Sequence, residues 1–136
     1  MSPTQSVTAD ANSQVKKGLQ ERYLDFVLGY AKRGWAVFPI YRPMEGECPC
    51  PKPDCPAPGK HPGTAHGFYD ATADENAIRA WWEEDVPFAN VGIRTGQESG
   101  LVVLDVDPRH GGDESLRQLE AKYGALPETP TVLSGG

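Results

Sequence analysis

One short apolar stretch that ends in two acidic residues constrains the fold of this chain more than any other feature. Residues 100–108 read GLVVLDVDP, with a glycine before the apolar run and a proline after it. A short run of this kind, bounded by strand-breaking residues, predicts a buried β-strand. Successive side chains of a strand point to opposite faces, so Val103, Asp105 and Asp107 are expected to share one face. That face changes from apolar to acidic as the strand ends.

The acidic pair suggests a site for a divalent cation. Residues two apart in a strand lie about 7 Å from each other at Cα, so Asp105 and Asp107 can lean onto one cation or onto two adjacent ones. Two carboxylates side by side at the edge of an apolar layer repel each other. A hard cation such as Mg²⁺ or Mn²⁺ would cancel that repulsion. The alternative is turn chemistry, in which Asp107 and Pro108 only end the strand.

The cysteines form a second candidate metal site. All three lie within eight positions of the proline-rich segment 41–64, and a histidine follows them with the spacing C-x-C-x4-C-x5-H. Thiolates and an imidazole are the ligands that zinc prefers, and four of them close a tetrahedral site. The candidate zinc ligands are Cys48, Cys50, Cys55 and His61. His66 competes as the fourth ligand, and the alternative is three free thiols in a flexible loop.

Two basic residues are candidate contacts for a substrate. Lys60 lies beside the candidate ligand His61, where it can meet a phosphate or remain a solvated loop charge. Arg94 ends an expected strand over residues 90–94, and it can bind phosphate or substrate or remain a solvated charge. The sequence leaves both alternatives open.

Apolar periodicity and turn residues predict the elements of the first half of the chain. Residues 1–13 are small and polar, which predicts a disordered N-terminal arm. A helix is expected from 14 to 32, ended by Gly34, with a strand over 35–40 after it. Thr72 and Glu75 have the form of a capping box.

The second half of the chain is expected to contain three strands, one of them the acidic stretch, and two helices. The helix that begins after Thr72 carries Trp81 and Trp82, which we interpret as packing residues. The strand over 90–94 and the acidic strand are expected to pair antiparallel. A helix then follows over 111–123, and a last strand over 131–133.

Composition and charge exclude several classes of protein. A length of 136 residues predicts a single domain at most. The net charge of −6 is unlike a nucleic-acid binder taken whole, so any nucleic-acid contact must be local. No apolar run approaches the length of a membrane span, and the N-terminus has no signal-peptide core. The sequence therefore predicts a cytoplasmic protein with no membrane partner.

Several motifs follow one another along the chain in a characteristic order. They are GWAVFP at 34–39, GKHP at 59–62, AT at 71–72, WW at 81–82, NVGI at 90–93, TG at 95–96 and the acidic stretch at 100–108. In this order they resemble the N-terminal primase–polymerase (prim-pol) domain of bifunctional DNA primase/polymerases. That family belongs to the archaeo-eukaryotic primase superfamily and is common in plasmid, phage and integrated-element replication proteins. The resemblance covers nearly the whole chain after the N-terminal arm.

The resemblance implies both a fold and an activity. The fold is α/β (α+β), a mixed sheet with flanking helices and a zinc-binding loop. The implied activity is template-directed nucleotidyl transfer, in which Asp105 and Asp107 hold the catalytic Mg²⁺ or Mn²⁺ ions. Two such cations would bridge the attacking 3′-hydroxyl and the triphosphate. The implied partners are a DNA template and primer, nucleoside triphosphates and a replicative helicase, and the implied Zn²⁺ site is Cys48, Cys50, Cys55 and His61.

The same resemblance predicts that the chain lacks part of the active site. The family follows the Thr-x-x-Ser-Gly-Gly stretch, here 131–136, with a phosphate-contacting histidine and later a third acidic ligand. Residues 14–136 are therefore expected to be the N-terminal part of a prim-pol domain, incomplete at the C-terminus and inactive alone. One alternative function is a non-catalytic zinc-containing binding module. Another is a haloacid-dehalogenase-type phosphatase, which Arg109 argues against because that pattern requires Thr or Val at this position.

Overall fold

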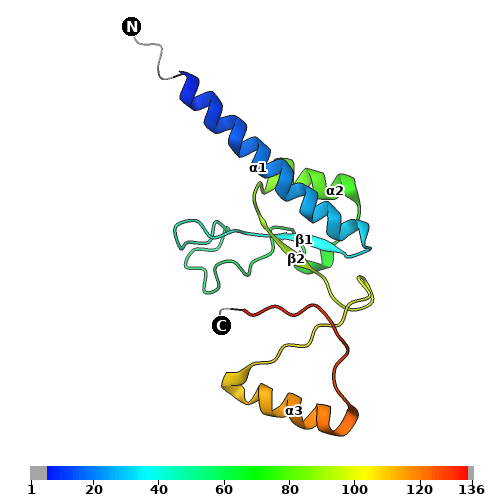
Figure 1. The fold of residues 1–136 in the computed structure, drawn as a ribbon. Coiled ribbons are helices and arrows are strands. Elements are labelled where there is room, and N and C mark those ends of the chain that lie inside the picture. Colours follow the sequence, from blue (N-terminus) through cyan, green and yellow to red (C-terminus); the bar gives the residue numbers. More distant parts are fainter. Residues whose placement is uncertain (1–5, 135–136) are drawn as a thin grey trace. The chain divides into compact units, whose positions relative to one another are not determined.

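The structure is a computed structural model that describes residues 6–134 (Figure 1). Its elements in chain order are α1 (Ser6–Lys32), β1 (Val37–Ile40), the 3₁₀ helix η1 (Gly67–Asp70), α2 (Glu75–Arg79), the π-helical turn η2 (Ala80–Asp85), β2 (Asn90–Ile93), the 3₁₀ helix η3 (Pro108–His110) and α3 (Gly112–Tyr123). The expected α/β class, with helices flanking a sheet, is confirmed. The sheet of the described residues has two antiparallel strands. The residues fall into two compact units that divide between Val102 and Val103.

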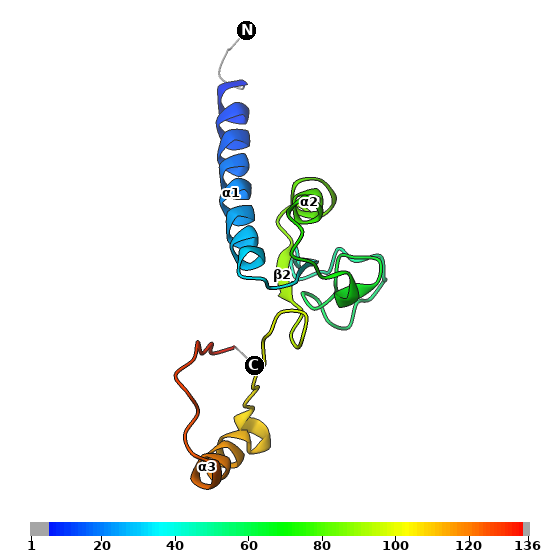
Figure 2. The same ribbon diagram turned by 90° about the vertical axis from the view of Figure 1, so that its right-hand side faces the viewer.

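The core of the first unit lies between the helices α1 and α2–η2 and the strand β1. Figures 1 and 2 show α1 and α2 side by side near the two strands. The buried side chains are Leu24, Val27, Leu28, Ala31, Val37, Ile78, Trp82 and Ala89. Each large apolar side chain removed from water in this way contributes roughly 1.5–3 kcal/mol. The indole N–H of Trp82 also donates to the Ala89 carbonyl at 2.9 Å, so the expected packing role of Trp82 is confirmed.

The two strands fit closely because one of their residues is glycine. Phe38 pairs with Gly92 in the antiparallel register. A Cβ placed on Gly92 would lie 2.4 Å from Cζ of the Phe38 ring, so only glycine lets the ring cross the neighbouring strand. Phe38 therefore packs on β2 itself, while Val37 belongs to the core beneath the helices.

The other edge of β1 holds the long loop between β1 and α2. The backbone N–H of Tyr41 donates to the His61 carbonyl at 2.9 Å, and Gly63 N–H donates to the Pro39 carbonyl at 2.7 Å. Farther along the same edge, Val37 and Thr72 exchange two backbone hydrogen bonds of 2.9 and 3.0 Å. The loop is thus fixed to the strand both before and after η1.

Helix α1 begins earlier than the sequence predicted. Residues 6–13 are helical rather than disordered, and residues 1–5 of the expected arm lie outside the described residues. No proline or glycine interrupts the chain between Ser6 and Gly18, so a helix nucleated farther along can propagate back through this stretch. Lys32 ends α1 as predicted, and Gly34 has the left-handed φ of 82°. No helix within residues 6–134 is long and apolar enough to cross a membrane.

The expected capping box before α2 is wrong by two positions. Asp74 is the N-cap, because its carboxylate accepts a hydrogen bond from Ala77 N–H at 2.9 Å. The hydroxyl of Thr72 instead accepts from Asp74 N–H at 3.0 Å. Thr72 cannot reach the first turn because its own backbone is paired with β1.

The acidic stretch is not a strand, which corrects the central expectation from the sequence. Leu101 forms one isolated bridge with Gly96, and residues 102–107 have no regular secondary structure. Val102 is 96% exposed, although the sequence pattern predicted a buried strand residue. A strand is stabilised by hydrogen bonds and packing with a neighbouring strand, and an apolar pattern alone does not supply that neighbour. The expected antiparallel pair of this stretch with β2 is therefore also wrong.

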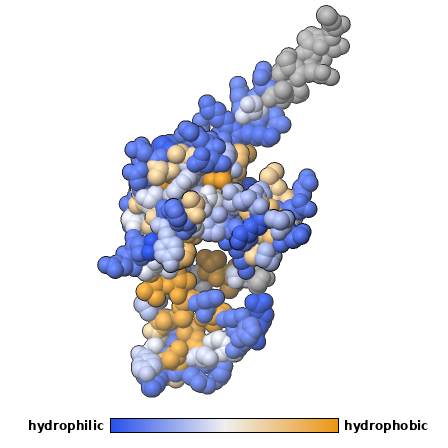
Figure 3. Space-filling model, turned by 180° about the vertical axis from the view of Figure 1, so that it is seen from behind, coloured by the Kyte–Doolittle hydropathy of each residue, from blue (hydrophilic) through white to orange (hydrophobic). Residues whose placement is uncertain are grey.

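The second unit contains η3 and α3 and exposes much of its apolar surface. The helix α3 spans Gly112–Tyr123 and ends before Gly124, close to the expected 111–123. The predicted last strand over 131–133 is irregular, and Val132 is 87% exposed. Figure 3 shows the hydrophobic surface that gathers around this part of the chain.

Candidate metal centre

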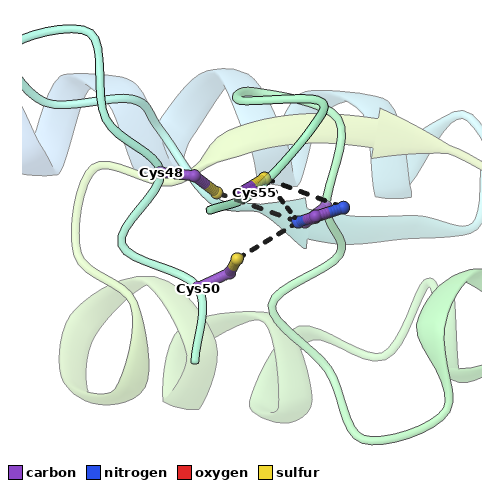
Figure 4. Close-up of side chains that lie close together, drawn as sticks. Cys48, Cys50 and Cys55 are labelled. Carbon is purple, nitrogen blue, oxygen red and sulfur yellow. Dashed lines mark hydrogen bonds between the residues drawn. The ribbon is translucent and has the colours of Figure 1, made fainter. Parts of the chain in front are cut away.

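The structure brings all four predicted zinc ligands together. The ligand atoms of Cys48, Cys50, Cys55 and His61 lie within 4.8 Å of one another. Figure 4 shows the three cysteine side chains pointing toward one imidazole ring. The hydrogen bond from Tyr41 to the His61 backbone fixes this histidine at the edge of β1, so the cysteines gather around an anchored residue.

The distances fit a tetrahedral zinc site. The Nδ1 atom of His61 lies 3.9 Å from Cys48 Sγ, 3.2 Å from Cys50 Sγ and 3.1 Å from Cys55 Sγ. Tetrahedral bonds of about 2.3 Å to sulfur and about 2.0 Å to nitrogen place these atoms roughly 3.5 Å apart. Nδ1 is therefore the imidazole nitrogen that faces the sulfurs, because Nε2 lies farther from Cys55 at 3.9 Å.

The protonation of the thiols also suits a metal site. Burial opposes the ionisation of Cys48, but hydrogen bonds from the Cys50 backbone and from the other two thiols lower the pKa of Cys48 below its ordinary value. Burial, together with the hydrogen bonds to Cys48 and Cys50, raises the pKa of the Cys55 thiol. A zinc ion binds thiolates, so it would take the place of the thiol protons.

His66, the competing fourth ligand, lies in a different environment. Its Nδ1 atom is 3.0 Å from Asp70 Oδ1, and its backbone N–H donates to Asp70 Oδ2 at 2.8 Å. The backbone hydrogen bond is the main reason that the pKa of Asp70 lies below its ordinary value. His66 therefore contributes to the start of η1, and His61 is the histidine of the cluster.

The two acidic residues are in different surroundings. The Asp107 carboxylate accepts hydrogen bonds from Arg109 Nε at 3.1 Å and from the Arg109 backbone N–H at 3.0 Å, and it lies 2.8 Å from His110 Nδ1. The side chains of Arg109 and His110 lower the pKa of the Asp107 carboxyl below its ordinary value. Asp105 is exposed two residues earlier.

Local backbone geometry explains the position of Asp107. The residue caps η3, and its carbonyl accepts from both His110 N–H at 3.1 Å and Gly112 N–H at 2.9 Å. A Cβ on Gly112 would lie 2.7 Å from the Asp107 backbone nitrogen, so this tight turn requires glycine there. Asp107 is thus held by a turn rather than by a sheet, which is the turn chemistry that the sequence left open.

The two candidate basic residues differ in how firmly they are held. Lys60 is exposed on the loop beside His61. Arg94 directly follows β2, and its guanidinium lies 2.5 Å from Glu98 Oε1. The Arg94 guanidinium also lies over the rings of Phe68 and Tyr69. Arg94 is therefore a fixed charge with defined neighbours and not a freely solvated one.

A comparison with protein-family models decides the identity of the chain. Residues 27–136 match the model of Prim-Pol, the bifunctional DNA primase/polymerase N-terminal domain. This chain belongs to the prim-pol family. No curated protein and no solved structure matches the chain.

The family match confirms the resemblance that the motifs carried. The matched range of the prim-pol domain contains the cysteine loop, Arg94 and the acidic pair. Membership of a primase/polymerase family implies binding of nucleic acid and nucleotides in general. It gives no support to the phosphatase alternative.

The prim-pol chain also has a group of residues that the sequence reasoning missed. Phe68 and Tyr69 form η1, where their rings stack with centroids 4.3 Å apart, and both are exposed. Two adjacent aromatic residues between a glycine and an aspartate, GFYD at 67–70, were the available signal. Their proximity to Arg94 could not be read from the sequence, because 24 intervening residues fold back through α2 and β2.

Proposed function

We propose that this prim-pol chain takes part in template-directed nucleotidyl transfer on DNA, with Asp105 and Asp107 as ligands of Mg²⁺ or Mn²⁺. The observation that carries the proposal is the family match, whose range includes the acidic pair. In this reaction the primer 3′-hydroxyl attacks the α-phosphorus of a nucleoside triphosphate, and pyrophosphate leaves. Asp105 and Asp107 would hold the cations, which would supply charge stabilisation for this transfer.

The surroundings of Asp107 support its part in this proposal. Arg109 and His110 contact its carboxylate and lower its pKa, which favours the ionised form that binds a cation. A divalent cation offers more charge than either partner, and it would displace them from the carboxylate. Arg109 and His110 would then be free to meet the phosphates of the incoming nucleotide.

The number of ligands limits what the described residues do by themselves. Among residues 6–134, the Cys₃His cluster is the only group of three or more potential ligands whose ligand atoms all lie close together. The acidic pair does not form such a group, although His110 Nδ1 lies 2.8 Å from Asp107 Oδ2. Two cations need more oxygen ligands than two carboxylates supply. Loss of one charge-stabilising group typically slows an enzyme about 100- to 1,000-fold. We therefore expect these residues to bind a cation weakly and to extend a primer poorly on their own.

We also propose that zinc organises the loop over residues 41–64. The loop carries few apolar residues and exposes most of its side chains, so burial gives it little stability. A zinc ion on Cys48, Cys50, Cys55 and His61 would cross-link it and hold it against β1. The expected helicase partner and a place in mobile-element replication stay predictions.

A titration with Mn²⁺ followed by NMR tests the cation site. Bound Mn²⁺ should broaden amide signals from residues 103–109 more than others, and Asp105→Asn combined with Asp107→Asn should abolish this local effect. Glu83→Gln combined with Glu84→Gln is the matched control, because it removes two neighbouring exposed acids elsewhere. Uniform broadening, or broadening centred on residues 83–85, would show that the wrong acids were chosen.

Primer extension tests the expectation about activity. The zinc-loaded chain is incubated with a labelled primer and template, four deoxynucleotides and Mg²⁺ or Mn²⁺, beside Asp105→Ala. Little or no extension is expected. Extension that disappears in Asp105→Ala would contradict this expectation and show that the described carboxylates suffice for catalysis.

A non-catalytic zinc-containing binding module is the second candidate function. The observation that favours it is the contrast between an assembled Cys₃His cluster and an acidic pair that forms no such group of ligands among residues 6–134. This alternative predicts that Asp105→Asn with Asp107→Asn leaves nucleic-acid binding unchanged in the presence of Mn²⁺. The catalytic proposal predicts that the double variant weakens the binding of nucleoside triphosphates, because their phosphates would meet the bound cation.

A further inference from the structure

Phe68, Tyr69 and Arg94 form an exposed aromatic platform on the first unit. The Arg94 guanidinium carbon lies 5.5 Å from the centroid of the Phe68 ring and 5.3 Å from that of Tyr69. The two rings are stacked on each other with an interplanar angle of 28°. Phe68 is 45% exposed and Tyr69 is 68% exposed, so much of both rings faces water.

Hydrogen bonds hold the backbone on both sides of η1. Before η1, Gly63 donates to the carbonyl of Pro39 in β1, and Thr64 Oγ1 donates to the Gly67 carbonyl at 2.7 Å. After η1, Thr72 exchanges two hydrogen bonds with Val37 of the same strand. The backbone that carries the rings is therefore fixed before any ligand arrives, which lowers the entropic cost of binding.

Arg94 is held on the platform by its own neighbours. Its backbone N–H donates to the Ala36 carbonyl at 2.9 Å, which extends the pairing of β2 with β1 by one residue. Ser99 Oγ donates to the Arg94 carbonyl and accepts from Ala36 N–H at 2.8 Å. Its guanidinium is anchored by Glu98. Beside it is an open pocket of about 410 Å³, whose lining residues are Phe38, Phe68, Ile93, Arg94, Thr95 and Glu98.

We propose that this platform binds an unpaired nucleobase by stacking on Tyr69 and Phe68. Aromatic side chains and the guanidinium plane of arginine are the groups on which proteins stack single-stranded bases. Neither ring belongs to the buried cluster of the core, so packing against that cluster does not account for them. This inference rests on the proposed function, since it names the part of the nucleic acid or nucleotide that this surface would take.

The charges around the platform favour a base over a phosphate. The Glu98 carboxylate neutralises the guanidinium that a phosphate would need, and a carboxylate repels an anion. A base has a neutral π face, and stacking on it does not require free positive charge. The chain as a whole has a net charge of −6, so contacts that do not depend on phosphate suit it better. The base can belong to a single strand or to a free nucleotide.

Fluorescence anisotropy of a labelled single-stranded oligodeoxynucleotide of about 12 residues tests the platform, with the zinc-loaded full chain. Tyr69→Ala should weaken binding about 5- to 150-fold, the loss expected for one stacked base. Tyr69→Phe keeps the ring and should bind within about two-fold of the wild type. Tyr123→Ala is the matched control, because Tyr123 is also an exposed tyrosine beside a cation, Lys122, at 4.9 Å. It should not change binding, and circular dichroism checks that each variant is folded.

NMR titrations distinguish the sources of the base. A deoxynucleoside monophosphate that shifts the signals of residues 67–70 as strongly as the oligonucleotide would assign the platform to the incoming nucleotide. Shifts with the oligonucleotide alone would assign it to a single strand. Inorganic triphosphate should shift none of these signals, and an equal shift with triphosphate would overturn the proposal.

Failure of the platform proposal can be distinguished from failure of the proposed function. Suppose that the wild type binds the oligonucleotide and that the Tyr69→Ala and Tyr123→Ala variants bind it with equal affinity. The platform then does not bind a base, while the proposed function stands. If the wild type binds neither oligonucleotide nor nucleotide, both the inference and the proposed function fail.

Discussion

Two short apolar segments of this chain, both beginning with valine, differ in secondary structure and in burial. Residues 37–40 read VFPI and form the buried strand β1, whereas residues 102–104 read VVL and form no strand. Val37 is 0% exposed and Val102 is 96% exposed. The difference lies in their partners, because β1 has β2 on one edge, the loop on the other and α1 against one face. An apolar pattern predicts that a segment can be a strand, and a neighbour decides whether it is one.

The largest expected effect is the difference in stability between the valine-to-alanine variants of the two segments. Val37→Ala should lower the free energy of unfolding by about 2–3 kcal/mol, since it removes buried methyl groups and leaves a cavity. Val102→Ala should change it by less than about 0.5 kcal/mol, as is usual for exposed positions. Urea denaturation followed by tryptophan fluorescence measures both, because Trp35, Trp81 and Trp82 all lie in the first unit. Equal losses in the two variants would mean that residues 102–104 are buried in solution.

Gly92→Ala should disturb the pairing of the two strands. The new methyl group would meet the Phe38 ring at 2.4 Å, so the ring or the strand must move. Overpacking of this kind typically costs about 1–3 kcal/mol. The same denaturation assay measures the loss, with Gly29→Ala as the control, because a Cβ at that helical position meets no other atom within 4 Å. A Gly92→Ala variant as stable as the wild type would contradict the close fit of Phe38 on β2.

Arg109→Ala, in the second unit, should give the smallest effect, a change in the affinity for Mn²⁺. Arg109 and a cation compete for the Asp107 carboxylate. Removing this exposed partner should strengthen Mn²⁺ binding at residues 103–109, at most about five-fold. The NMR titration with Mn²⁺ measures the change, and Arg117→Ala on α3 is the control. Weaker binding in Arg109→Ala would show that Arg109 orders the site for the cation and does not compete with it.

Local signals in the sequence predicted the elements that pack on each other. The helical spacing of apolar residues predicted α1, and the glycine at 34 predicted its end. The spacing was that of Leu19, Tyr23, Phe26, Val27 and Tyr30, of which Leu19 and Phe26 are exposed in the structure. The cysteine spacing predicted the metal cluster because zinc chemistry selects those residue types wherever the loop brings them. These predictions succeeded because the residues that determine helix formation and zinc coordination lie close together in the sequence.

Other features depend on contacts that the sequence does not reveal. Thr72 and Asp74 are both good N-caps, and only the pairing of Thr72 with Val37 decides between them. No apolar pattern in the first residues predicts that α1 begins at Ser6. Arg94 meets Phe68 and Tyr69 through the fold of the intervening chain. Tertiary contacts of this kind lie beyond periodicity and local chemistry.

The zinc content of the purified chain tests the central claim most directly, namely that the Cys₃His cluster is the metal centre of this prim-pol domain. Freshly reduced protein, prepared without chelator, should carry about one zinc per chain by elemental analysis. His66→Ala should keep that zinc, since His66 pairs with Asp70, whereas His61→Ala should lose most of it in a weak chelator. Cys50→Ser should lose zinc likewise and become sensitive to protease within residues 41–64. Wild-type protein without zinc, or equal loss in the two histidine variants, would contradict the claim.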